Sequence, residues 1–180
     1  PSMDLLKLND DFSIEVLGEN ISVDLGGIGK GYAVDKIAEV LTEWKIERAL
    51  IHGGTSSVLA MGSPKGKSGW RITLTNPADN SKIMCLEMKN EVLSCSGLQQ
   101  GQHIVNPFTG QPVTDRRACW IRIKTSAALA DALTTAGMIM PDEKIRYLQE
   151  DVPEMAVILL MSTEGQELKL YKIGMWPDNR

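Results

Sequence analysis

Residues 24–35 read Asp-Leu-Gly-Gly-Ile-Gly-Lys-Gly-Tyr-Ala-Val-Asp, a glycine-rich stretch that joins an expected strand to an expected helix. Glycines at such a junction let a ligand approach the backbone, and the first N–H groups of a helix can bind an anion. Lys30 could add a charged contact to a phosphate. The stretch is not a P-loop, because no Ser or Thr follows Gly29-Lys30, and its glycine spacing differs from the dinucleotide fingerprint. Alone, it is explained equally well as a tight structural turn.

Three helices are expected on the C-terminal side of this stretch. The apolar spacing in Lys30–Trp44 indicates the first helix. Ser126 is a good N-cap for a second helix, which would run to about Ile139. Pro141 can begin a third, short helix that would reach about Gln149.

Strands make up most of the remaining pattern. Alternating apolar residues in Phe12–Leu25 predict a hairpin that turns at Gly18-Glu19-Asn20. A closing hairpin is expected around Glu164-Gly165, between strands 156–161 and 168–173. Other strands are expected at 48–51, 57–61, 70–75, 83–88, 92–95 and 119–124. Because most strands follow one another without an intervening helix, we expect an α+β fold with mostly antiparallel sheets and packed helices.

Length and composition indicate one globular domain spanning residues 1–180. Hydrophobic residues make up 43% and charged residues 23%, which excludes a wholly disordered chain. The net charge of −4 argues against a nucleic-acid partner, because phosphate backbones select basic surfaces. Cys85, Cys95 and Cys119 lack metal-binding spacing and are expected to be small buried or half-buried hydrophobic residues.

Two further segments combine turns with polar side chains. The segment 51–57, Ile-His-Gly-Gly-Thr-Ser-Ser, could bind a phosphate or could simply reverse the chain. In the segment 103–110, His-Ile-Val-Asn-Pro-Phe-Thr-Gly, His103 could act as a general base near neutral pH. A rigid turn stabilised by Asn106 and Thr109 explains the second segment equally well.

The segment 130–136, Ala-Asp-Ala-Leu-Thr-Thr-Ala, carries an acid and a hydroxyl on the second expected helix. Asp131 and Thr135 are separated by four positions and therefore share one helix face. Together they could give two oxygen ligands to Mg²⁺. A solvated polar stripe would show the same spacing.

All four segments, in this order, resemble the ApbE family of FAD:protein FMN transferases. Residues 23–35 match the family's first block, except that Gly29 replaces Ala. His103–Gly110 match its histidine block, with Asn106 where Asp is usual, and Ala130–Thr135 match its Ala-Asp-Ala-Leu-x-Thr helix. The resemblance covers nearly the whole chain and implies an ApbE-like (T-fold-like) architecture. The family's flavin-contacting part upstream of the first block is almost absent, so we expect a short or truncated form.

The resemblance also implies a role for each matching residue. Asp131, Thr135 and the main-chain carbonyl of Gly29 would hold Mg²⁺. The implied catalytic residues are His103, Lys30 and Asp35, and these three would also contact FAD or shape its pocket. The rest of the implied nucleotide cleft consists of Gly27, Gly53, Gly54, Thr55 and Ser56.

The implied reaction is Mg²⁺-dependent transfer of FMN from FAD to a protein hydroxyl, with release of AMP. The implied partner is an acceptor flavoprotein subunit with a Thr/Ser flavinylation motif, and a dimer is left open. Two alternatives remain: an FAD-binding or FAD-hydrolysing relative without protein transfer, and a non-catalytic interaction module. The expected compartment is the periplasmic face of a bacterial cell envelope if a leader was removed, and the cytoplasm otherwise.

Overall fold

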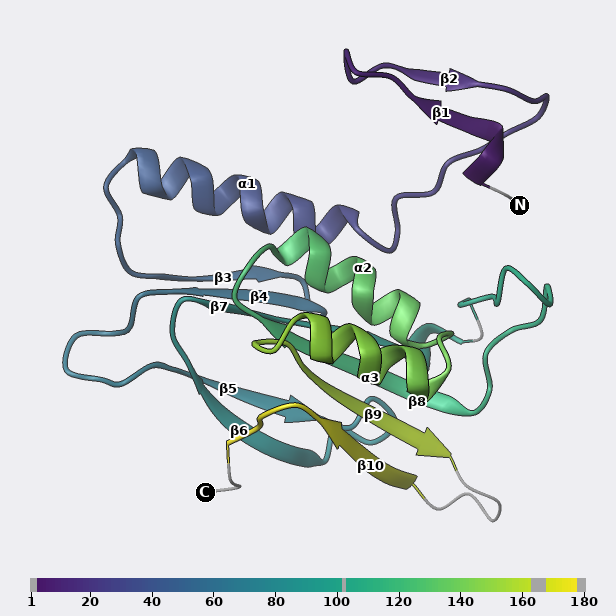
Figure 1. Ribbon diagram of the computed structural model, residues 1–180. Helices are drawn as coiled ribbons and strands as arrows, with labels where there is room; N and C mark the ends of the chain where they lie inside the picture. The colour runs from purple at the N-terminus through teal and green to yellow at the C-terminus, as the bar shows by residue number, and fades with distance from the viewer. Residues whose placement is uncertain (1–2, 102, 163–167, 178–180) are drawn as a thin grey trace.

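The computed structural model describes residues 3–101, 103–162 and 168–177, and its centre is a six-stranded sheet (Figure 1). The strand order is β10-β9-β8-β7-β4-β3, and every neighbouring pair is antiparallel. The strands are β3 (Ala49–Gly53), β4 (Ser57–Met61), β7 (Glu91–Gly97), β8 (Arg116–Ile123), β9 (Ala156–Ser162) and β10 (Leu168–Ile173).

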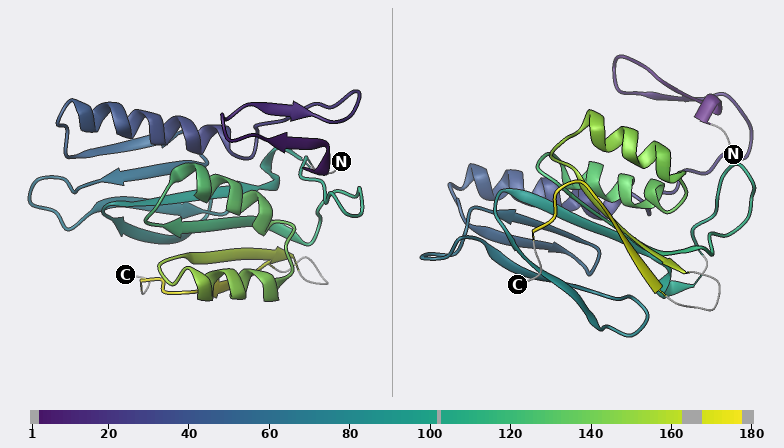
Figure 2. Two further views of the ribbon diagram at one scale, coloured as in Figure 1. Left: turned by 45° about the horizontal axis from the view of Figure 1, so that its top comes forward. Right: turned by 60° about the horizontal axis from the view of Figure 1, so that its bottom comes forward.

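Three helices cover one face of this sheet: α1 (Gly29–Glu43), α2 (Ala127–Gly137) and α3 (Asp142–Asp151) (Figures 1 and 2). The period-two alternation of β8 divides its side chains between the two faces. Cys119 and Ile121 belong to the core beneath the helices, whereas Ala118 and Trp120 belong to the core on the opposite face. Strand β8, in the middle of the sheet, is therefore buried on both faces.

A two-stranded ribbon, β5 (Trp70–Thr75) and β6 (Lys82–Met88), covers the face opposite the helices. Leu74 and Leu86 are each 2% exposed and pack with Trp120 in the second core. The ribbon therefore closes the second core and forms one wall of a cavity described below.

The N-terminal hairpin differs from the sequence prediction. Its strands are β1 (Leu6–Leu8) and β2 (Ile14–Val16), and no strand forms at residues 20–25. The chain reverses at 9–13, where the N–H of Asn9 donates to the Ser13 carbonyl and the Asp11 carboxylate accepts the Ser13 N–H at 2.9 Å. This turn around Asp11 pairs β2 with the preceding strand β1 instead of with residues 20–25. The prediction of a hairpin across Phe12–Leu25 was therefore wrong.

The predicted α+β class with mostly antiparallel sheets is confirmed, and the element boundaries shift by a few residues. Ser126 caps α2, because its Oγ accepts the Leu129 N–H at 3.2 Å, but the helix ends at Gly137 instead of Ile139. Strand β8 begins at Arg116, three residues earlier than predicted, because its first two residues are charged and interrupt the apolar alternation. The predicted turn at Glu164-Gly165 lies outside the described residues. None of the described helices is long and apolar enough to cross a membrane.

The three thiols differ in their environment. Burial raises the pKa of the Cys119 thiol to about 12, and burial also raises the pKa of Cys95. A hydrogen bond from the Thr73 side chain lowers the pKa of Cys85, which is half-buried on the β5–β6 ribbon. Thiolate is the reactive form, so the three thiols should react at different rates.

Alkylation of the folded protein at about pH 8 is expected to modify Cys85 selectively, because the other two thiols stay protonated there. Mass spectrometry of peptides after brief iodoacetamide treatment measures this selectivity. In urea, all three cysteines should react at similar rates. Equal labelling of Cys85 and Cys119 in the native chain would contradict the burial of Cys119.

Candidate functional site

The glycine-rich segment lies directly on helix α2. A Cβ atom added to Gly31 would lie 2.1 Å from the carbonyl oxygen of Ala127, far inside contact distance. A Cβ atom on Gly27 would lie 3.2 Å from Thr135 Oγ1. Glycine at these positions therefore lets the backbone approach α2 near both of its ends, which brings two of the predicted blocks together.

Asp131 connects the two segments through a buried hydrogen bond. Its side chain projects from α2, is only 2% exposed, and accepts the Gly31 N–H through Oδ2 at 2.9 Å. This burial excludes the alternative interpretation, in which Asp131 belongs to a solvated polar stripe. A carboxylate is stable in such a buried place only with hydrogen-bonding or charged partners.

The predicted anion-binding N–H groups at the start of α1 are largely engaged within the protein. The Gly29 N–H donates to the Leu25 carbonyl at 2.8 Å, and the Gly31 N–H donates to Asp131. Lys30 is exposed, and its Nζ lies 3.4 Å from the carbonyl oxygen of Gly26. Its exposed ammonium group could contact a phosphate.

Thr135 lies in a cluster of three hydroxyl groups between α2 and β7. Ser96 Oγ lies 2.9 Å from Thr134 Oγ1 and 3.0 Å from Thr135 Oγ1. Thr134 Oγ1 donates to the main-chain carbonyl of Asp131 at 2.8 Å. The sequence analysis did not assign roles to Ser96 or Thr134, because a serine in a strand and a second threonine in a helix carry no pattern of their own.

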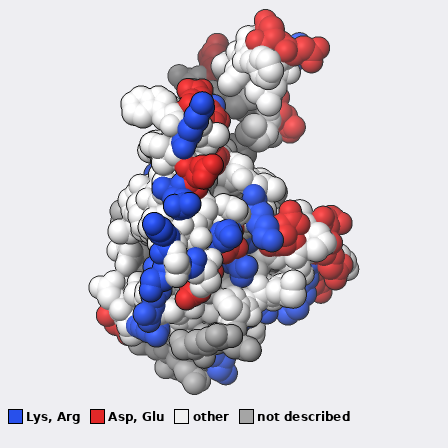
Figure 3. Space-filling view, turned by 90° about the vertical axis from the view of Figure 1, so that its left-hand side faces the viewer, with Lys and Arg blue, Asp and Glu red and all other residues white. Residues whose placement is uncertain are grey.

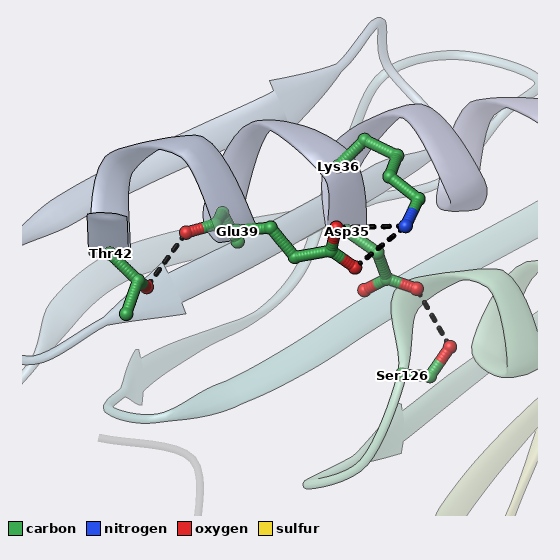
Figure 4. A network of polar contacts seen from close by, with 6 residues as sticks. Asp35, Lys36, Glu39, Thr42 and Ser126 are labelled. Atoms are coloured by element: carbon green, nitrogen blue, oxygen red, sulfur yellow. Dashed lines mark hydrogen bonds and ion pairs between the residues drawn. The ribbon is translucent and has the colours of Figure 1, made fainter. Parts of the chain in front are cut away.

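Asp35 holds the N-terminus of α2 (Figure 4). Its carboxylate accepts the Ser126 hydroxyl at 2.7 Å, the Ala127 N–H at 2.8 Å and the Ala128 N–H at 2.9 Å. These are otherwise orphan donors at the start of a helix, where negative charge is favourable. Asp35 therefore caps the N-terminus of α2 and helps to fix the position of this helix. Its implied contact with FAD stays a prediction.

Replacement of Asp35 by Ala is expected to lower the free energy of unfolding by about 2 kcal/mol, because three donors at the start of α2 lose their acceptor. Urea denaturation followed by circular dichroism measures this change. The control is Asp24→Ala, since the exposed Asp24 accepts one N–H, that of Gly26, at 2.8 Å. Equal losses in the two variants would contradict the capping role.

The oxygen donors around α2 fit a hard divalent cation. Asp131 offers a carboxylate and Thr135 a hydroxyl, and Gly27 lies close to that hydroxyl. Gly29 is the first residue of α1, and its carbonyl oxygen has a second lone pair besides the one used in the helix. In the described part of the chain, no three His, Cys, Asp or Glu side chains gather around a common point. These donors suit Mg²⁺ or Mn²⁺ better than a zinc-type ion.

A cavity of about 350 Å³ opens between β4, β7 and the β5–β6 ribbon. Three of the four residues predicted from segment 51–57 line it, namely Gly54, Thr55 and Ser56. The fourth, Gly53, packs against α1, since a Cβ atom there would lie 2.8 Å from Val34 Cγ2. The polar lining includes residues that had no sequence signal: Thr73, Thr75, Asn80 and Gln99.

His103 lies on an exposed loop whose geometry agrees with the rigid-turn interpretation. Asn106 Oδ1 accepts the Phe108 N–H at 2.9 Å, and Thr109 Oγ1 accepts the Gln111 N–H at 3.3 Å. His103 Nδ1 lies 3.0 Å from the Gly101 carbonyl, which can only accept, so Nδ1 carries the proton. Nε2 of the neutral ring is then free to accept a proton. Within the described residues, no hydrogen bond joins His103 to the glycine segment or α2.

Charge is distributed unevenly over the surface. Figure 3 views the left-hand side of Figure 1, where lysine and arginine side chains outnumber acidic ones on the body of the molecule. The net charge of −4 does not describe this surface, so the exclusion of a nucleic-acid partner stays a prediction.

Similarity to known proteins agrees with this geometry. Residues 1–159 match the sequence profile of the ApbE family. The chain is 27% identical over 163 residues to the FAD:protein FMN transferase of Klebsiella pneumoniae, a match covering 84% of this chain and 46% of that protein. It is 26% identical over 167 residues to the FAD:protein FMN transferase of Escherichia coli K12, with the same coverage. The chain spans about half the length of the curated relatives it matches.

Solved structures show the same fold. The flavin transferase ApbE from Vibrio cholerae aligns with a TM-score of 0.80 and 24% identity, over 96% of this chain and 57% of that one. The apo form of the Pseudomonas stutzeri flavinyl transferase ApbE aligns with a TM-score of 0.78 and 25% identity, over 96% and 55%. The predicted ApbE-like architecture is therefore confirmed.

Proposed function

The chain belongs to the ApbE family, and from this premise we propose that it transfers FMN from FAD to a Thr or Ser hydroxyl of an acceptor protein. Mg²⁺ would be required, and AMP would be released. The observation that supports the proposal is the contact between the glycine segment and α2, in which the Gly31 N–H donates to Asp131 and Gly27 lies against Thr135. The names of the matched relatives support flavin transfer as the reaction class.

Asp131, Thr135 and the Gly29 carbonyl would hold the cation. When bound, Mg²⁺ would supply positive charge that neutralises the negative charge developing on the pyrophosphate. Asp131 already accepts the Gly31 N–H, so its carboxylate is fixed in orientation before any ion arrives. Asp35 fixes the start of the same helix. Such preorganised charge is the main source of catalysis expected in phosphoryl transfer.

The remaining predicted residues would bind FAD and handle a proton. Lys30 would contact a phosphate oxygen through its exposed ammonium group. Gly54, Thr55 and Ser56 would contact the nucleotide from the rim of the cavity. His103 would accept the acceptor's hydroxyl proton at Nε2, the ring nitrogen that the Gly101 carbonyl leaves unprotonated.

The atoms of the proposed reaction balance without an oxidant or reductant. The acceptor oxygen forms a bond to the FMN-side phosphorus, and the bond from that phosphorus to the bridging oxygen breaks. AMP leaves with the electron pair of the broken bond, and the hydroxyl proton passes to the base. We propose a flavoprotein subunit with a Thr/Ser flavinylation motif as the acceptor.

The direct test is to incubate the purified chain with FAD, Mg²⁺ and an acceptor protein that carries a flavinylation motif. A covalent FMN mass on the acceptor, absent after EDTA treatment, is the expected result. The matched control is an acceptor whose target Thr is replaced by Val. FAD split to FMN and AMP without any adduct would favour hydrolysis, and retention of intact FAD with several acceptors would refute transfer.

A further inference from the structure

We propose that Ser96 is a positioning residue that orients the Thr135 hydroxyl toward a bound cation. The proposal rests on the proposed function, since it concerns the same metal site. Ser96 lies on β7, and its side-chain oxygen lies within hydrogen-bond distance of Thr134 and Thr135 on α2. In this proposal Ser96 does not coordinate the ion, and it influences cation affinity only by orienting the Thr135 hydroxyl.

The direction of every hydrogen bond in the Ser96–Thr134–Thr135 cluster can be derived from one fixed point. The main-chain carbonyl of Asp131 can only accept, so Thr134 Oγ1 donates its single proton to that carbonyl at 2.8 Å. Thr134 Oγ1 must therefore accept in its contact with Ser96 at 2.9 Å. Ser96 Oγ therefore donates its single proton to Thr134 Oγ1, and it must accept the Thr135 proton at 3.0 Å.

The resulting relay runs from Thr135 to Ser96, from Ser96 to Thr134, and from Thr134 to the Asp131 carbonyl. Its outcome is that the Thr135 proton points at Ser96. Both lone pairs of Thr135 Oγ1 are then available, and a hydroxyl needs a free lone pair to coordinate a cation.

A competing arrangement for Thr135 is weaker. Its hydroxyl also lies 3.4 Å from the Asp131 carbonyl, but this distance is long for an O–H···O bond and the carbonyl already accepts from Thr134. Ser96 is therefore the better acceptor for the Thr135 proton. Thr134 is fully buried and Ser96 is half-buried, so water does not readily replace either partner.

Two substitutions test the relay, each read out as the affinity of the metal-stripped chain for Mn²⁺. Ser96→Ala removes the acceptor of the Thr135 proton. Thr134→Val keeps the shape of the side chain but removes the acceptor of the Ser96 proton, which then turns to Thr135 Oγ1 and occupies a lone pair. Both variants are expected to bind Mn²⁺ about tenfold more weakly, the usual size of an outer-shell effect.

The matched control is Ser94→Ala, the same chemical change two residues away on β7. Ser94 donates to Ser57 Oγ at 3.1 Å, so this variant loses a buried hydrogen bond outside the cluster. It should lower the melting temperature while its Mn²⁺ affinity stays within about twofold of the unsubstituted chain. Free Mn²⁺ is followed by electron paramagnetic resonance, with and without FAD, and folding is checked by circular dichroism.

The outcomes separate the relay from the metal site itself. Weaker binding in both variants, with the control unchanged, supports the relay. Unchanged affinity in Thr134→Val would overturn the ordered relay, and unchanged affinity in Ser96→Ala would overturn any role for Ser96. If the unsubstituted chain binds no Mn²⁺ even with FAD, the proposed metal site fails together with the relay. If Mn²⁺ binds normally but no FMN is transferred, the proposed activity alone fails.

Discussion

Replacement of Asp131 by Asn is expected to reduce metal-dependent FMN transfer by about 10³-fold, equivalent to about 4 kcal/mol of transition-state stabilisation. The substitution removes the one charged group among the proposed ligands. Its amide oxygen can still accept the Gly31 N–H, which the carboxylate accepts at 2.9 Å. The fold should therefore survive while the cation is lost. Initial rates of adduct formation over a range of Mg²⁺ concentrations measure the effect.

Asp151→Asn is the matched control for Asp131→Asn, because Asp151 is an exposed carboxylate at the end of α3. Its transfer rate should equal that of the unsubstituted chain. Unchanged transfer in Asp131→Asn would remove Asp131 from the metal site. Unfolding of Asp131→Asn would instead show that its carboxylate mainly stabilises the contact between α1 and α2, and Mn²⁺ affinity of any folded fraction would then decide the ligand role.

Replacement of Gly31 by Ala is expected to lower the free energy of unfolding by about 3 kcal/mol, at the upper end of overpacking effects. The new methyl group would lie 2.1 Å from the Ala127 carbonyl and 2.8 Å from Ala128 Cα, both of them backbone atoms that cannot rotate away. Helices α1 and α2 must therefore separate, and the Gly31 N–H moves off Asp131. Urea denaturation measures the loss of stability, and Mn²⁺ titration measures the accompanying loss of affinity.

Gly29→Ala is the matched control, two positions away in the same helix. A Cβ atom at Gly29 meets only Leu25 Cβ, at 3.8 Å, which is ordinary contact. This variant should be as stable as the unsubstituted chain or up to about 0.5 kcal/mol more stable, because Ala favours helix. A similar loss in both variants would mean that flexibility of the glycine segment, and not its contact with α2, determines stability.

The sequence predicted the elements whose residues repeat at a clear period. Helix α1 was predicted to within one residue at each end, because apolar residues recur over four turns, and the cap at Ser126 located the start of α2. Strand pairing at the N-terminus was not predictable in the same way. Leu6–Leu8 has only three residues, too few to show alternation, and the turn beside it depends on one aspartate side chain.

The candidate site was predictable in part. Asp131 and Thr135 share a helix face by spacing alone, but their burial depends on glycines about a hundred residues earlier in the chain. The part played by Asp35 in capping α2 was not foreseen, because a helix cap supplied by another helix leaves no local signal. The polar lining of the cavity and the position of Ser96 also arise only when the β5–β6 ribbon and β7 are in place.

The distance in sequence between the two halves of the proposed metal site affects how a nascent chain can assemble it. Gly31 and Asp131 are 100 residues apart, and Asp35 and Ser126 are 91 apart. During synthesis from the N-terminus, helix α1 leaves the ribosome well before α2 is made. The packing partner of its glycine segment is therefore still absent at that stage. The strands between them must pair first, since they shorten the loop that this contact closes. If the proposed site binds a cation, that binding should therefore appear among the last events of refolding, after the central sheet has formed.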